Sequence, residues 1–118
     1  MITPRFGIWV PVYGPWGTRH HPQEPPQPSY ARALDIVVQA ERLNFADALL
    51  AQHMINPMNN DFDQLETWSA LTALAQATRH IEIMGAVKPF FIGSDPIRQI
   101  KEQAEQQWAS GRRLTPAV

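Results

Sequence analysis

Residues 66–87, ETWSALTALAQATRHIEIMGAV, contain the pattern of a helix followed closely by a buried strand. Trp68, Leu71 and Ala75 recur at helical spacing, which predicts a helix with one apolar face that ends near residue 80. The apolar run over residues 81–87 is short, as is typical of a strand in the middle of a parallel sheet. We therefore expect Trp68 to pack between this helix and the sheet.

Residues that favour helix starts precede this helix and an earlier one. Asp63 and Glu66 have the spacing of a capping box, with Asp in place of Ser or Thr. Ser29 is the expected N-cap of a helix over about residues 30–43, whose apolar residues also recur at helical spacing. Both helices are therefore predicted from a start signal and from periodicity together.

Strands and helices alternate along the whole chain. Asp95 followed by Pro96 predicts the start of a third helix, which should stop at Ser110 and Gly111. Pro11 lacks the N–H group of a ladder and should lie near the end of the first strand. The predicted strands are residues 6–13, expected to be buried on both faces, then 48–51, 81–87 and a fourth that starts at 114.

This order predicts an α/β fold with parallel strands and right-handed crossovers. A small doubly wound sheet and part of a barrel both satisfy it. A whole (β/α)8 barrel takes about 250 residues, whereas this chain has 118. If the fold is that of a barrel, the chain therefore supplies only the first strand–helix units of it.

Composition excludes several classes of function. The formal net charge is −1, without the basic patch that nucleic acids or acidic lipid surfaces require. The absence of cysteine excludes disulfides, a thiolate nucleophile and thiolate metal sites. We see neither a signal peptide nor an apolar run of the roughly 20 residues that span a bilayer. A cytoplasmic protein is the expectation.

Two common kinds of site are poorly supported. The glycines that follow the first strand, in Tyr13-Gly14-Pro15-Trp16-Gly17, fit neither the dinucleotide fingerprint nor the P-loop. A metal-dependent hydrolase would rest on His20, His21, His53 and Asp61, without a paired-histidine helix motif. Solvent-exposed loop histidines are the simpler interpretation, so no metal site is predicted.

Residues at the carboxyl ends of strands are better candidates, because parallel α/β folds place their chemistry there. His53 follows the second strand and could act as a general base, or could only bond the neighbouring loop. Lys88 follows the third strand and could attract an anion, or could be an ordinary exposed lysine. Trp9 and Tyr13 could stack on a flat ring or serve only in packing.

Several segments together resemble one family, the luciferase-like flavin-dependent monooxygenases. Their order and spacing carry the resemblance, which covers about residues 5–113. NPMNNDFDQLETW, residues 56–68, is most similar to the sulfonate and sulfone monooxygenases of that family. The matching segments are FGIWVP (6–11), LLAQH (49–53), ETW (66–68), ALAQAT (73–78), IEI (81–83) and PIRQ (96–99).

The resemblance implies the first three to four units of a TIM-type (β/α)8 barrel that binds reduced FMN at the carboxyl ends of its strands. It implies oxygenation of a small organosulfur compound with O2, and a separate flavin reductase as partner. Gln52, His53 and Lys88 match positions beside the flavin, and His53 is the implied catalytic residue. The implied substrate contacts are Trp9, Tyr13 and Asn60.

Residues 103–118 depart from the family pattern. Ser110 and Arg113 stay in register, but Gln and Ala replace apolar positions of the third helix, which should then pack weakly on the sheet. A flavin-binding Asn of the family falls at Ala117. Because the family grips the FMN phosphate with its last strands, we expect this chain alone to hold FMN weakly and to need a complementing chain for catalysis.

A second hypothesis is a non-catalytic, self-associating α/β module derived from the family. Its open sheet edges would pair with another copy and form a homo-oligomer. A lid role for the proline-rich segment 14–28 is a further expectation, because long loops near strand ends commonly bind ligands.

Overall fold

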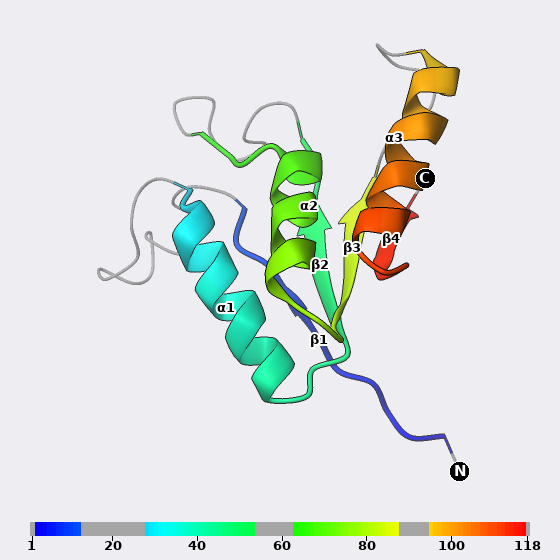
Figure 1. Cartoon of the computed structure of the whole chain (residues 1–118). Coiled ribbons are helices and arrows are strands. Elements are labelled where there is room, and N and C mark those ends of the chain that lie inside the picture. The colour runs from blue at the N-terminus through cyan, green and yellow to red at the C-terminus, as the bar shows by residue number, and fades with distance from the viewer. Residues whose placement is uncertain (1, 13–27, 54–62, 88–94, 118) are drawn as a thin grey trace.

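The computed structural model describes residues 2–12, 28–53, 63–87 and 95–117 (Figure 1). Strands and helices alternate as the sequence predicts. None of the helices in these ranges is long and apolar enough to cross a membrane. The elements are β1 (Gly7–Trp9), α1 (Tyr30–Arg42), β2 (Asp47–Ala51), α2 (Thr67–Ala77), β3 (Glu82–Ala86), α3 (Pro96–Ala109) and β4 (Leu114–Ala117).

The four strands form one parallel sheet in the order β1-β2-β3-β4. Each strand lies beside its neighbour in the chain, and α1 and α2 lie on the same side of the sheet (Figure 1). A doubly wound sheet would reverse its strand order and carry helices on both faces. The observed order is that of a barrel wall, which confirms the predicted first units of a (β/α)8 fold.

The core lies between the sheet and the first two helices. Ala48, Leu50 and Ile83 alternate along β2 and β3 and are fully buried. Leu71 and Leu74 of α2 are also fully buried in the same cluster. Removing these side chains from water is the main stabilising contribution here, at roughly 25 cal/mol per Å² of apolar surface.

Helix starts agree with the sequence at two of three positions. Ser29 and Asp95 are the N-caps of α1 and α3, as expected. The capping box at Asp63 is wrong, because Glu66 itself is the N-cap of α2 and accepts hydrogen bonds from the N–H groups of Trp68 and Ser69. The preceding backbone is held elsewhere, since the residue before Glu66 donates its N–H to a carbonyl beyond β1.

The first strand is shorter and more open than predicted. The ladder spans only Gly7–Trp9, because Pro11 cannot donate to it. Trp9 is 61% exposed, so the expectation of burial on both faces is wrong for this strand. Val10 and Val12 remain fully buried beyond the ladder.

Helix α3 packs weakly, which confirms the expectation from its Gln-rich sequence. Gln99 is the buried residue of this helix. Ser110 follows as the C-cap, and its hydroxyl accepts a hydrogen bond from the N–H of Arg113 at 3.3 Å. The Arg113 guanidinium then donates to oxygens at the end of α2 and the start of β3, namely Ala75 O, Thr78 O, Thr78 Oγ1 and Ile81 O.

Candidate active site

The carboxyl ends of β1, β2 and β3 meet at one edge of the sheet. On the face away from the helices, Trp9 is in register with Leu49, and Leu49 with Met84. One step nearer the carboxyl edge, Ala51 pairs with Ala86. The side chains of this face therefore become small where a barrel would open to its ligand.

Gln52 is fixed at this edge by two hydrogen bonds. Its N–H donates to the carbonyl of Ala86 at 2.6 Å, which ties the residue to the end of β3. Its side-chain Oε1 accepts from the indole N–H of Trp68 in α2. The side-chain oxygen Oε1 of Gln52 is therefore occupied by a hydrogen bond. Its side-chain NH2 group supplies the donors for a ligand.

Helix α2 holds this arrangement from behind. The buried hydroxyl of Thr67 donates to the carbonyl of Ala51 at 2.7 Å. The Trp68 ring lies over Gly85, where a Cβ atom would come within 2.9 Å of the indole. The predicted packing of Trp68 between helix and sheet is thus confirmed, and glycine is required for that close approach.

His53 directly follows Gln52 and is exposed at the same edge. The structure thereby brings Gln52 and His53 beside the end of β3, and Trp9 lies on the adjoining inner face. The roles of all three residues stay predictions. The other predicted site residues, Lys88, Tyr13 and Asn60, lie outside the described residues, as do His20, His21, Asp61 and residues 14–27.

The opposite end of the sheet carries an ion cluster that the sequence analysis missed. Arg5 donates to Asp47 at 2.8 Å and to Glu82 at 3.1 Å. The Asp47 carboxylate, and then that of Glu82, raises the pKa of the Arg5 guanidinium above its usual range. The signal was an acidic residue at the start of two parallel strands, which places both carboxylates at one end. In barrels this end serves stability.

A metal site has no support in the described ranges. No group of three or more His, Cys, Asp or Glu side chains that could hold an ion occurs among these residues.

Residues at the carboxyl edge do fit a flat, hydrogen-bonding cofactor such as a flavin. Ala86 is a small, partly exposed residue at this edge, and Trp9 supplies an exposed aromatic surface. The fixed amide of Gln52 supplies donors for carbonyl or ring-nitrogen acceptors. Small apolar walls with a few oriented polar groups are typical of cofactor sites.

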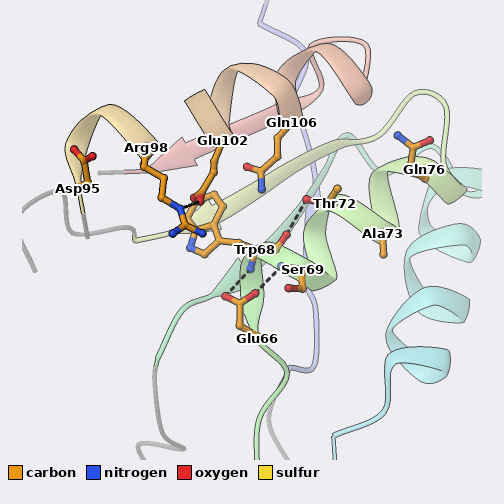
Figure 2. A pocket seen from close by; sticks show the side chains of 10 residues that line it. All are labelled: Glu66, Trp68, Ser69, Thr72, Ala73, Gln76, Asp95, Arg98, Glu102 and Gln106. Atoms are coloured by element: carbon orange, nitrogen blue, oxygen red, sulfur yellow. Dashed lines mark hydrogen bonds and ion pairs between the residues drawn. The ribbon is translucent and has the colours of Figure 1, made fainter. Parts of the chain in front are cut away.

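A second hollow lies on the helical side, between α2 and α3 (Figure 2). This groove has a volume of about 910 Å³ and is open to solvent. Glu66, Arg98 and Glu102 are among its lining residues, and Arg98 pairs with Glu102 at 2.8 Å. Its lining includes Trp68, whose indole N–H donates to Gln52.

Comparisons with known proteins agree with this geometry. The model of the luciferase-like monooxygenase family matches residues 5–112. The fold is similar to the crystal structure of monooxygenase RslO1 from Streptomyces bottropensis, with a TM-score of 0.63 and 19% identity over 96% of this chain. The chain spans 32% of that neighbour's length. Comparison with curated proteins found no match. On the family match, the chain belongs to the luciferase-like monooxygenase family.

Proposed function

We propose that this chain contributes the flavin-facing wall of a monooxygenase that uses reduced FMN and O2. The observation that carries this proposal is the fixed amide of Gln52 beside the small residues Ala51 and Ala86. Gln52 is held by its backbone N–H and by its side-chain oxygen, so its amide loses little further side-chain freedom when it meets a flavin ring. Family membership supports a flavin rather than another planar ligand.

Reduced FMN, when bound, supplies the electrons that activate O2. Gln52 binds and orients the ring edge through its amide N–H groups, and the small side chain of Ala86 lets the ring approach the end of β3. His53 follows on the same edge, where its imidazole nitrogens hold or move a proton during oxygenation. Lys88 completes the proposed flavin contacts through its positive charge.

The proposed substrate is a small organosulfur compound, a sulfonate or a sulfone. Trp9 offers the exposed aromatic surface for it on the inner face of the sheet, and Tyr13 and Asn60 are the other proposed contacts. A separate flavin reductase in the cytoplasm supplies the reduced cofactor. The chain spans a third of its structural neighbour, so the remaining barrel wall comes from further polypeptide.

Mapping the binding of photoreduced FMN by NMR tests this proposal. Under anaerobic conditions we expect chemical-shift changes at the amides of residues 51–53 and 86–87. The amides near Arg5 and Glu82, at the opposite end of the sheet, serve as the internal control. Dimethyl sulfone added to the complex should then shift the indole signal of Trp9, assigned with the Trp9→Phe variant.

Two outcomes would overturn the proposal. One is a folded chain whose spectrum does not change with reduced FMN, which would favour the non-catalytic module. The other is a set of shifts confined to the amino ends of the strands or to the groove between α2 and α3. If FMN shifts the expected amides but the sulfone leaves Trp9 unchanged, the sulfur substrate alone is contradicted.

A further inference from the structure

Trp68 links helix α2 to the carboxyl edge of the sheet. This residue is only 8% exposed, and its indole N–H donates to the side-chain oxygen Oε1 of Gln52. An amide turned end for end has nearly the same shape, so a neighbouring group has to set its direction. The indole nitrogen is a donor and never an acceptor. The amide oxygen of Gln52 must therefore face Trp68, and its NH2 group must point away from the indole.

The Trp68 side chain is itself held in place. The Glu66 carboxylate accepts a hydrogen bond from the backbone N–H of Trp68 at 3.1 Å, which fixes the residue in the first turn of α2 (Figure 2). The ring lies against Gly85, where a Cβ atom would come within 2.9 Å of the indole. A ring with so little room to turn keeps its N–H directed at Gln52.

Gln52 consequently presents donors alone to a ligand at the carboxyl edge. Its backbone N–H already donates to the carbonyl of Ala86 at 2.6 Å, and its side-chain oxygen is turned toward Trp68. The side-chain NH2 group is the part that can meet a ligand, and it pairs only with an acceptor. An N–H group of a ligand at the same point would face another donor and lose its own hydrogen bond.

The ring system of a flavin carries both kinds of group along its polar edge. The two carbonyl oxygens of its pyrimidine ring are acceptors in every redox state. The nitrogen N5 is an acceptor in the oxidised ring but carries a hydrogen in the reduced ring. A contact that offers donors alone therefore fits a carbonyl oxygen of the reduced flavin and does not fit its N5–H group.

We propose that Trp68 is a positioning residue that makes Gln52 a donor to a carbonyl oxygen of the flavin's pyrimidine ring. This inference rests on the proposed function, and it adds the part of the ring that Gln52 recognises and the residue that enforces the choice. Without the indole N–H, the amide turns over and presents either its oxygen or its NH2 group. Affinity for reduced FMN should then fall by about threefold, because binding must first order the amide.

Replacing the indole N–H alone tests the first step. β-(3-Benzothienyl)alanine, incorporated in place of Trp68 by amber suppression, keeps the shape of tryptophan but has sulfur where the N–H was. In the chain without ligand, we expect the ¹⁵N order parameter of the Gln52 side-chain amide to fall from near the rigid value of about 0.85 to about 0.6 or below. The same replacement of Trp108, which is 87% exposed on α3, is the matched control and should leave this order parameter unchanged.

The ¹³C spectrum of bound flavin tests the second step. FMN labelled at both pyrimidine carbonyl carbons and photoreduced under anaerobic conditions should show a downfield shift of one carbonyl carbon when it binds the natural chain. Hydrogen bonding to the oxygen withdraws electron density from that carbon. Replacement of Trp68 should reduce the shift of the bound flavin and lower its affinity about threefold. Replacement of Trp108 should match the natural chain, and urea unfolding checks that both variants fold.

The possible results distinguish this inference from the proposed function. A folded natural chain that does not bind reduced FMN would overturn both. Binding with the same carbonyl shift and affinity before and after replacement of Trp68 would overturn the positioning role alone. An order parameter of Gln52 that the replacement leaves unchanged would do the same. A ¹⁵N shift at N5 of labelled FMN, without a shift at either carbonyl carbon, would overturn the assignment of the ring edge.

Discussion

Gly85 supports the candidate site because it lets the Trp68 ring lie against β3. A Cβ atom there would meet the indole at 2.9 Å and the Leu71 side chain at 3.3 Å. We predict that Gly85→Ala destabilises the fold by about 1–3 kcal/mol through overpacking. Urea unfolding measures this change. Because the clash needs the indole, Trp68→Leu combined with Gly85→Ala should cost less than the sum of the single changes; additive effects would contradict this.

Glu41 couples folding to pH. Its carboxylate accepts hydrogen bonds from the backbone N–H groups of Arg79, His80 and Ile81 at 2.7–3.0 Å. Burial is the largest single influence and raises the pKa of Glu41. The three backbone hydrogen bonds, together with the nearby imidazole of His80, outweigh burial, so the pKa of Glu41 lies below its ordinary value of 4.5. The folded protein thus favours the charged carboxylate.

The sign of the pH effect follows from this lowered pKa. The Glu41 contribution to stability is fully present above about pH 4.5, the unfolded pKa, and is lost as pH falls through the folded pKa. Glu41→Gln should lower stability at neutral pH and flatten the loss of stability below about pH 4.5. Urea midpoints from pH 3 to 7 test this, with Glu105→Gln on the exposed surface as control. An unchanged acid slope in Glu41→Gln would contradict the prediction.

At the scale of elements, Arg113 joins the end of α2 to the start of β3 and to β4. Its guanidinium donates to three carbonyl oxygens and one hydroxyl at 2.6–3.1 Å. We predict that Arg113→Met lowers the free energy of unfolding by about 2–3 kcal/mol, because these oxygens lose a charged partner. Arg113→Lys should recover part of the loss, since a single ammonium group cannot reach all four oxygens. If urea unfolding gives Arg113→Met and Arg113→Lys the same free energy of unfolding as the natural chain, this role of Arg113 is excluded.

The sheet-facing side of α3 should tolerate a more apolar residue. The Gln103 side-chain nitrogen is buried without a hydrogen bond among the described residues. Gln103→Leu should therefore raise stability by about 1 kcal/mol, because it removes a buried polar group and adds apolar packing. Glu105→Leu, which changes an exposed residue of the same helix, serves as the control. A lower urea midpoint for Gln103→Leu would show that the amide has a partner that it needs.

Local signals predicted the elements well where the deciding contact lies within the element. Ser29 and Asp95 cap their helices because each lies directly before a helical pattern. Asp63 failed as a cap because the backbone before Glu66 bonds to the chain beyond β1, a contact distant in sequence. The apolar run of β1 likewise predicted a buried strand without showing that Trp9 faces an open side.

At the scale of the molecule, alternation of strands and helices predicted a parallel sheet but left two architectures open. The strand order in the structure decides between the two architectures in favour of a barrel wall, since β1 to β4 lie in sequence order. The positions of Gln52 and His53 after β2 were predictable because parallel strands end at one edge. The bond between Gln52 and Trp68 was not, because it joins residues on separate elements whose packing only the fold determines.

An anaerobic titration of photoreduced FMN against the purified 118-residue chain tests the central claim most directly. We predict saturable but weak binding, which Gln52→Leu weakens at least tenfold and Trp68→Phe weakens less. His80→Ala, at the opposite end of the sheet beside Glu41, should leave the affinity unchanged. Urea unfolding checks that each variant folds. The absence of saturable binding by the folded natural chain, or equal affinities for it and Gln52→Leu, would contradict a flavin site at the carboxyl ends of these strands.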